Sequence, residues 1–439
     1  KELAKSHTGA IAGNDDAFNA FINYHGIARV EIFETLIEIP NLFKNKKRSE
    51  SKRVGIVTTT GGGGAMVVES LSGSDIEIID PGLSIKKIMQ DNNIAFNNNK
   101  LVDLTIAGTK PEIVNEVISQ MMKNENCDLV VMVVGSSAKF RPEQAVEPLL
   151  KWANYPKPLA VYVAPDAPEA LTLLHKNNIA CFRTPESCAQ SVKTFLNTRN
   201  PVKQKILKNN LSNISKKLKK NISKNLSEEE ALEIFKDIGI QIVDYKVCFN
   251  EKQAIEHSSQ IGFPLAMKVL SSEIMHKTET GGVELNIKNL EEVKISFKKL
   301  SDVFQKLKIN SSEKKFIIQK MEKGIAEIIL GYRVDELVGP IVVIGSGGIL
   351  SEIYNDKSIR MAPVDITEAK KMIKEVKSLV TITGYRGLPE VDINIIATAI
   401  VNISKFALVK EIKEAEINPV IVKKNNEGIV AVDGLITLK

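Results

Sequence analysis

The sequence predicts an α/β protein in two parts, a parallel sheet covered by helices and then an α+β unit with mixed or antiparallel sheet. Strand-like and helical segments alternate up to about residue 200, which is the pattern of a parallel sheet. After residue 225, several strand-like segments alternate apolar and polar residues, which suits antiparallel strands. The length of 439 residues agrees with two or more parts, because it exceeds what one hydrophobic core usually supports.

The first part is expected to begin its sheet at Arg53, in the segment RVGIVTTTGGGGAMVVESL. A short β-branched run, a cluster of glycines and a helical apolar pattern follow one another there, so the segment predicts a strand, a tight loop and a helix. Further strands are expected at residues 127–135 and 158–165, and the sheet is expected to end near residue 200.

Residues 200–225 are rich in Lys, Asn and Ser and are interpreted as a partly helical connection between the two parts. Eight lysines fall between residues 203 and 224 without any Asp or Glu, and they exceed the whole net charge of +6. The positive charge is therefore local, and no aromatic residues interleave there to stack on bases. We expect a solvated linker and no nucleic-acid partner.

The second part is expected to begin at LSEEEALEIFKDIGI, where Ser227 can cap a helix with Glu230 at the capping-box position. It runs to Lys439, with helices expected at residues 290–307 and 365–380. The expected strands are FPLAMKVL, GGVELNI, KFIIQKM, EIILGYRV and GPIVVIG.

The composition, 43% hydrophobic and 26% charged, is that of a soluble globular protein. Four cysteines without close pairs favour a reducing cytoplasm over a disulfide framework or a zinc site. No apolar run is long enough to span a bilayer, so no membrane partner is expected. The chain opens as if in the middle of a loop, and we expect a further segment upstream.

The opening segment SHTGAIAG places His7 in a loop of small residues, where a backbone can come close to a phosphate. A neutral imidazole is a useful nucleophile only where a phosphate is delivered to it. The alternative is a structural or incidental histidine.

The glycine cluster Gly61, Gly62, Gly63 and Gly64 lies between a predicted strand and a predicted helix. Backbone N–H groups and the helix dipole favour an anion at such a place, although the spacing does not match a dinucleotide fingerprint. The alternative is a tight turn with close helix packing.

Lys268 projects from a predicted strand and precedes a polar, glycine-ended loop that contains His276, Lys277 and Glu279. Loops of this kind often close over phosphates, and the alternative is a surface connection between strands.

Asn418 and Asp433 fall on two successive apolar strands that are expected to pair as a hairpin. Their oxygens suit a magnesium ion that carries nucleotide phosphates, and the alternative is a buried hydrogen-bonded pair.

Taken together and in this order, these segments resemble the nucleoside-diphosphate-forming acyl-CoA synthetase family, the ADP-forming acetate–CoA ligases, which are relatives of succinyl-CoA synthetase and ATP-citrate lyase. The resemblance covers nearly the whole chain. It implies a flavodoxin-like, succinyl-CoA ligase-like domain followed by a two-lobed ATP-grasp module. The implied boundaries are 1–45 for the end of a domain with a phosphohistidine loop, 46–200 for the flavodoxin-type domain, 201–225 for a linker and 226–439 for the ATP-grasp domain.

The SHTGA loop is similar to the family's phosphohistidine loop, and the glycine cluster is similar to its power helix, whose N-terminus steadies the phosphohistidine. The segment KLVDLT, residues 100–105, resembles another recurring stretch. By the same resemblance, His276 matches a second histidine that relays the phosphoryl group in some members. Glu279 stands where the family commonly has Asp, so a carboxylate is kept but its reach changes.

The resemblance also implies the residues that contact nucleotide and metal. They are Lys268 for phosphate, the hinge from Gln319 to Met321 for adenine, Glu327 for ribose, Glu352, Arg360 and Arg386 in further family motifs, and Asn418 with Asp433 for magnesium.

The implied reaction is acid + ATP + CoA = acyl-CoA + ADP + phosphate, reversible through phosphohistidine, with ATP or ADP, Mg²⁺ and CoA as cofactors. The expected partners are phosphate and a small carboxylic acid such as acetate, or its CoA thioester, and a homo-oligomer is left open. The family's CoA-binding Rossmann domain precedes the histidine loop, so most CoA contacts and the glutamate that orients the phosphohistidine are expected upstream. Two alternatives remain, a ligase that activates an unusual acid such as a sulfonium carboxylate before elimination, and a non-catalytic regulatory module of a fused protein acetyltransferase. Retention of the two histidines, Lys268, Asn418 and Asp433 argues against the second.

Overall fold

A computed structural model of the chain describes residues 15–439 except 45, 50, 97–99, 106, 108–109, 203–210, 220–223, 271–279, 307–313, 348–355, 388–389 and 425–426. The chain divides into two compact units, Ile22–Lys203 and a second unit that comprises Lys1–Phe21 and Gln204–Lys439. No helix in the described part of the chain is both long and apolar enough to cross a membrane. All four cysteines are free thiols.

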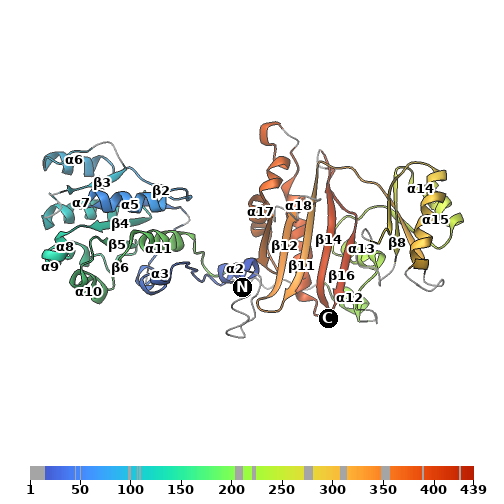
Figure 1. The fold of residues 1–439 in the computed structure, drawn as a ribbon, viewed down its shortest axis with the longest axis horizontal. Helices are drawn as coiled ribbons and strands as arrows, with labels where there is room; N and C mark the ends of the chain where they lie inside the picture. The colour runs from blue at the N-terminus through green and yellow to red at the C-terminus, as the bar shows by residue number, and fades with distance from the viewer. Residues whose placement is uncertain are drawn as a thin grey trace. The chain divides into compact units, whose positions relative to one another are not determined.

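The unit Ile22–Lys203 is built on a parallel sheet with the strand order β2-β1-β4-β5-β6, in which β3 also pairs with β1 (Figure 1). The strands are β1 (Arg53–Thr58), β2 (Glu77–Ile78), β3 (Leu101–Asp103), β4 (Leu129–Val134), β5 (Leu159–Val163) and β6 (Ala180–Phe182). Because β2 and β3 pair with the beginning and the end of β1, they share one edge of it. The order is therefore that of a flavodoxin-like domain, as predicted.

Helices cover both faces of this sheet, and every residue of β4 and β5 is buried. Val131 and Val133 lie in one apolar core with residues of α5 and α11, while Val130 and Met132 lie in a second core with residues of α7, α9 and α10. The helices of the unit are α2 (Asp15–Tyr24, which begins before it), α3 (Phe33–Glu38), α4 (Pro40–Phe43), α5 (Gly61–Leu71), α6 (Leu83–Asp91), α7 (Pro111–Lys123), α8 (Ser137–Phe140), α9 (Pro142–Leu150), α10 (Pro168–Lys176) and α11 (Pro185–Asn197).

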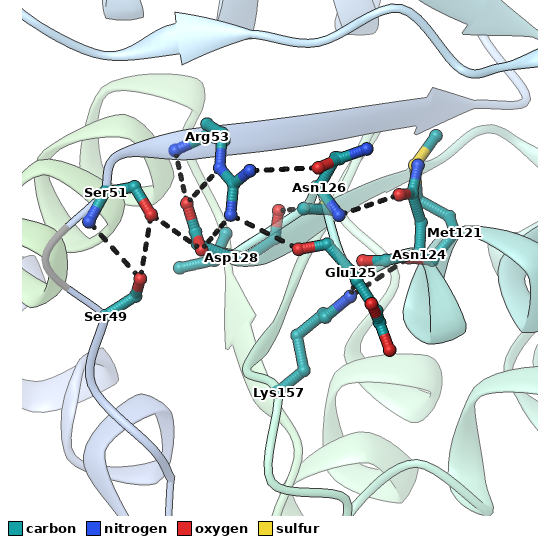
Figure 2. Close-up of polar contacts among 11 residues, drawn as sticks. Ser49, Ser51, Arg53, Met121, Asn124, Glu125, Asn126, Asp128 and Lys157 are labelled. Carbon is teal, nitrogen blue, oxygen red and sulfur yellow. Dashed lines mark hydrogen bonds and ion pairs between the residues drawn. The ribbon is translucent and has the colours of Figure 1, made fainter.

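A carboxylate network joins the amino ends of β1 and β4 (Figure 2). Asp128 accepts hydrogen bonds from the backbone N–H of Arg53 over 2.9 Å, from its Nε over 3.0 Å and from its Nη2 over 3.1 Å. Ser51 Oγ donates to the same carboxylate over 3.2 Å. The glycine cluster follows β1 at its other end, and ligand sites of open parallel sheets lie at the carboxyl ends of the strands. The network is therefore a stabilising feature and not a candidate site.

The second unit contains two antiparallel sheets, of which the smaller has the order β7-β10-β8-β9. Its elements are β7 (Tyr245–Cys248), α14 (Glu251–Ile261), β8 (Leu265–Leu270), β9 (Val283–Ile287), α15 (Leu290–Lys306) and β10 (Lys315–Lys320). One face of this sheet packs on α14 and α15, and Met267, Val269 and Phe316 belong to that core.

The larger sheet has the order β13-β12-β11-β14-β15, and β16 also pairs with β14. Its strands are β11 (Ala326–Asp335), β12 (Gly339–Ser346), β13 (Lys357–Met361), β14 (Ile412–Val422), β15 (Ile429–Ala431) and β16 (Gly434–Leu438). Its helices are α12 (Ser212–Leu218), α13 (Glu228–Asp237), α17 (Ile366–Glu375), α18 (Ile393–Ser404) and the 3₁₀ helices η3 (Lys377–Ile382), η4 (Tyr385–Gly387) and η5 (Lys405–Leu408). One apolar core contains residues of α12, α13, α17, α18 and this sheet. The predicted antiparallel character of the second part is confirmed.

Two segments differ from the sequence-based expectation. The lysine-rich segment contains α12, whose Ile214 and Leu218 are buried in the core of the larger sheet, so this part is not a solvated linker. The helix expected over residues 365–380 ends at Glu375, because the Asp356 carboxylate accepts hydrogen bonds from the backbone N–H groups of Lys377 and Ser378.

Candidate active site

A buried polar cluster joins the smaller sheet of the second unit to the turn between β15 and β16. Lys268 Nζ donates hydrogen bonds to Glu228 Oε1 and to Asp433 Oδ2, each over 2.9 Å. The side chain of Lys268 is 5% exposed, that of Glu228 is 0% exposed and that of Asp433 is 34% exposed. One cation is therefore shared by a carboxylate closed to solvent and a carboxylate open to it.

Gln319 is the fourth member of the cluster. Its Nε2 donates to Glu228 Oε1 over 2.9 Å and to the carbonyl of Val432 over 3.1 Å, and both neighbours are acceptors, which fixes the orientation of the amide. The side chain is fully buried, and its Oε1 has no hydrogen-bond partner among the described residues. A buried acceptor of this kind can receive a hydrogen bond from a ligand or an ordered water.

Strand alternation places Lys268 and Gln319 on one face of the smaller sheet. Lys268 pairs with Ile317 of β10, and Gln319 lies two residues further along that strand. The neighbouring residues along each strand, Met267 on β8 and Ile318 on β10, belong to the apolar core on the opposite face. The cluster therefore occupies the face that α14 and α15 do not cover.

Glu228 enters the cluster from the first turn of α13. The predicted capping box is confirmed, since Ser227 accepts from the Glu230 N–H and the Glu230 side chain accepts from the Ser227 N–H. The cap is thus made by these two residues, and Glu228 contacts Lys268 and Gln319 instead. Glu228 is buried together with Ala231, Leu232 and Phe235, three, four and seven residues later.

Asp433 and Asn418 are neighbours, but not in the way that the sequence predicted. Asn418 lies on β14, whereas Asp433 lies in the turn between β15 and β16 and not on a strand, because both short strands pair with β14. The Asn418 N–H donates to the Asp433 carbonyl over 3.2 Å, and the Gly434 N–H donates to Asp433 Oδ1 over 2.8 Å. A Cβ at Gly434 would lie 2.5 Å from Phe235 Cε2, so the turn requires glycine there.

The oxygens of Asp433 and Asn418 fit a magnesium ion that also binds phosphate. Asn418 Nδ2 donates to Glu416 Oε1 over 3.2 Å, so the side-chain oxygen Oδ1 of Asn418 is the atom left for a cation. No group of three or more His, Cys, Asp or Glu in the described part of the chain is arranged to hold a metal. Two protein oxygens suffice for Mg²⁺, which usually takes one or two protein ligands and completes its shell with water and phosphate.

The charges around Lys268 keep its ammonium protonated. Burial by itself lowers the pKa of this lysine, but the negative charges of Glu228 and Asp433 and the hydrogen bonds to them outweigh burial, and the pKa of Lys268 is raised above its ordinary value. A protonated ammonium of this kind is a donor that suits phosphate oxygens.

Met321 and Glu327 lie outside the hydrogen bonds of this cluster. Met321 follows β10, where its N–H donates to the Pro264 carbonyl over 3.1 Å and its Sδ accepts from the Asn286 N–H over 3.0 Å. Glu327 lies on β11, and its carbonyl accepts from the Gly347 N–H over 2.7 Å.

Arg360 and Arg386 also have other contacts. Arg360 Nε donates to Glu368 over 2.7 Å and its Nη2 donates to Glu375 over 2.6 Å, so its guanidinium is held by α17. Arg386 is exposed, has a positive φ of 53° and lies over the ring of Tyr385. Neither guanidinium belongs to the cluster around Lys268.

The glycine cluster begins α5 directly after β1, as predicted. A Cβ at Gly63 would lie 3.0 Å from Thr60 Cγ2, and one at Gly64 would lie 2.8 Å from Thr58 Cγ2, so close packing accounts for these two glycines. A Cβ at Gly61 would lie 2.6 Å from an Asp103 carboxylate oxygen, whereas Gly62 has open space around it. The predicted residues His7, His276, Glu279 and Glu352 lie outside the described residues.

Comparison with known proteins gives the family. A family profile described as "ATP-grasp domain" matches residues 217–438. The chain is 38% identical over 212 residues to the acetate–CoA ligase (ADP-forming) I subunit beta of Pyrococcus furiosus. The aligned region covers 48% of this chain and 90% of that subunit. It is 27% identical over 449 residues to the 4-hydroxybutyrate–CoA ligase (ADP-forming) of Nitrosopumilus maritimus, with 100% of this chain and 64% of the relative covered.

A third relative, the acetate–CoA ligase (ADP-forming) of Methanocaldococcus jannaschii, is 28% identical over 455 residues, with 98% of this chain and 64% of the relative covered. The chain thus spans somewhat under two thirds of the length of these two longer relatives. The three relatives are named for CoA ligases that form ADP, although for different acids. The chain therefore belongs to the ADP-forming acyl-CoA synthetase family, and residues 217–438 are its ATP-grasp domain.

Proposed function

We propose that this chain is the nucleotide-binding and phosphoryl-transferring part of an ADP-forming acyl-CoA ligase. The reaction is acid + ATP + CoA = acyl-CoA + ADP + phosphate, and it runs in either direction. The observation that carries the proposal is the buried Lys268, protonated and held between Glu228 and Asp433. The similarity to three ADP-forming CoA ligases supports it.

In this proposal the ATP-grasp domain binds the nucleotide against the cluster face of the smaller sheet. Lys268 contacts phosphate, the hinge from Gln319 to Met321 contacts adenine and Glu327 contacts ribose. Asp433 and Asn418 hold Mg²⁺, which when bound neutralises charge on the phosphates. Phosphoryl transfer needs mostly positioning and charge neutralisation, and a buried lysine beside a carboxylate and an amide provides both.

The phosphoryl relay rests on the family resemblance of the histidine segments. Phosphate attacks the thioester carbonyl and displaces CoA as its thiol, which leaves an acyl phosphate. His7 takes the phosphoryl group from the acyl phosphate and the carboxylic acid leaves. The phosphoryl group then passes to ADP, with His276 as the proposed second carrier and Glu279 as a proposed catalytic carboxylate. The backbone N–H groups that open α5 at Gly61 are of the kind that favours a phosphate anion.

The substrate is proposed as a small carboxylic acid, and acetate and 4-hydroxybutyrate are the acids for which the relatives are named. The proposal assigns no CoA contact to the described residues. Arg360, Arg386 and Glu352 remain proposed nucleotide contacts, and such a contact by Arg360 requires an ion pair with Glu368 or Glu375 to open. A cytoplasmic location and the domain limits at residues 45 and 200 belong to the same proposal.

The test is calorimetric titration of the chain with ADP in the presence and absence of Mg²⁺. The wild-type protein is expected to bind ADP more tightly with Mg²⁺, and Asp433→Ala is expected to lose most of that gain, about tenfold or more, because a charged ligand oxygen is removed. Asp302→Ala on α15 removes the same charge from an exposed position and serves as the matched control. A folded wild-type protein that does not bind Mg-ADP, or an Asp433→Ala variant with unchanged affinity, would refute the nucleotide site.

A further inference from the structure

Glu228 differs from every other charged member of the cluster in having no exposed side-chain surface. Its Oε1 accepts hydrogen bonds from both Lys268 Nζ and Gln319 Nε2, each over 2.9 Å. A carboxylate without solvent access cannot exchange these partners for a ligand in solution. Asp433 is 34% exposed and can do so.

Binding of a metal changes the two carboxylates differently. Asp433 Oδ2 is held by Lys268 and Oδ1 by the Gly434 N–H, so a divalent cation at Asp433 competes with the ammonium for the same carboxylate. Like charges at this separation repel strongly in a partly buried site. A divalent cation held there would weaken the Lys268–Asp433 ion pair, and Glu228 would then be the carboxylate that still holds Lys268.

We propose that Glu228 is a positioning residue, which holds the Lys268 ammonium in place on β8 when a metal engages Asp433. This inference rests on the proposed function, because it assumes that Asp433 binds Mg²⁺ and that Lys268 contacts nucleotide phosphate. Glu228 does not touch the nucleotide and acts through Lys268 and Gln319.

A purely structural role accounts less well for a charged group at this position. The helix cap is already made by Ser227 and Glu230, so α13 does not need the Glu228 carboxylate for its first turn. A buried ion pair is rarely more stabilising than apolar residues of the same volume, so stability alone gives no reason for a glutamate here. A lysine that has to stay in place when its second carboxylate is engaged by a metal does give such a reason.

The variant Glu228→Gln keeps the shape of the side chain and removes its charge, and Glu229→Gln removes the same charge one residue away as a matched control. ADP affinity is measured by calorimetry at pH 7, with and without Mg²⁺. Glu228→Gln is expected to weaken Mg-ADP binding about tenfold or more. Its loss is expected to be smaller without Mg²⁺, when Asp433 still holds Lys268, and Glu229→Gln is expected to stay within about twofold of wild type.

A double-mutant cycle with Lys268→Gln tests whether Glu228 acts through the lysine. The double variant Glu228→Gln/Lys268→Gln is expected to bind Mg-ADP no more weakly than Lys268→Gln alone. Circular dichroism checks the fold of each variant. If Glu228→Gln does not fold, Lys268→Gln is compared with the double variant, which has no buried unpaired charge. That comparison then decides whether Glu228 acts through Lys268.

Additive losses in the cycle overturn the role of Glu228, and so does a loss for Glu228→Gln that is equal with and without Mg²⁺. Wild-type affinity in Glu228→Gln overturns it as well. These outcomes leave nucleotide binding by the wild-type protein intact, so they differ from failure of the proposed function, in which the wild-type protein itself does not bind Mg-ADP.

Discussion

Replacement of Asp128 by Asn is expected to destabilise the unit Ile22–Lys203 by about 2–3 kcal/mol. The Asp128 side chain is 7% exposed and receives hydrogen bonds from the Arg53 backbone, from two guanidinium nitrogens of Arg53 and from Ser51. Asn keeps the size of the side chain, but its NH₂ group faces donors and its charge is gone. Breaking a fully buried pair costs about 3–5 kcal/mol, and the cost here is lower because the Arg53 side chain is 29% exposed and can be partly solvated.

Fluorescence of Trp152 measures this unit alone. It is the single tryptophan of the chain, it is 5% exposed, and it lies in the core shared by α7, α9 and α10. A loss of 2–3 kcal/mol corresponds to a decrease in Tm of roughly 5–10 °C for a unit of this size. Asp75→Asn, which breaks an ion pair with Lys52 at a carboxylate that is 65% exposed, is the control and is expected to cost about 1 kcal/mol or less.

The difference between wild type and Asp128→Asn is also expected to depend on pH. Burial by itself raises the pKa of Asp128, but the hydrogen bonds from Arg53 and Ser51 outweigh it and hold the pKa below its ordinary value. A carboxylate with a depressed pKa in the folded state contributes stability above its unfolded pKa of about 3.9 and loses it as the pH falls through the folded pKa. The difference is therefore full above about pH 5 and shrinks in more acidic solution. An equal Tm for Asp128→Asn and Asp75→Asn at pH 7, or a difference that grows on acidification, would refute this reasoning.

Two further predictions follow from Gly434 and His7. Gly434→Ala is expected to destabilise the second unit by about 1–3 kcal/mol, because its Cβ would lie 2.5 Å from Phe235 Cε2. Urea unfolding followed by circular dichroism measures the loss, and the unfolding transition reported by Trp152 fluorescence is expected to stay unchanged. A variant with the unfolding curve of the wild type would contradict the packing. His7→Ala is expected to abolish phosphate-dependent ATP formation from acyl-CoA by the complete enzyme while Mg-ADP binding is retained, and full activity of that variant would overturn the phosphohistidine relay.

The buried strands β4 and β5 were predictable from the sequence because each is a short apolar run with a clear end. The runs at residues 127–135 and 158–165 contain β4 and β5. The two-residue strand β2 has no such signal, and its place beside β1 depends on tertiary pairing. In α12 the lysines determined the composition and concealed the spacing of Ile214 and Leu218, which is that of a buried helix face.

Lys268, Gln319 and Asp433 were singled out from the sequence, but the contacts among them were not. Lys268 and Asp433 are 165 positions apart, and no local pattern shows that they share an ion pair. Glu228 was missed because an acidic first turn is ordinary in a helix. A usable signal was present, since Glu228 is in register with the buried Ala231, Leu232 and Phe235, and a carboxylate on the apolar face of a helix needs a partner.

The turn between β15 and β16 connects the two sheets of the second unit mechanically as well as chemically. Lys268 on β8 bonds Asp433, and Gln319 on β10 bonds the carbonyl of Val432, so two adjacent residues of one turn are tied to two adjacent strands of the smaller sheet. A cation that draws Asp433 away removes one of these two connections and leaves the amide of Gln319 as the other. If the chain binds nucleotide as proposed, metal binding at Asp433 is therefore expected to change the stiffness between the two sheets as well.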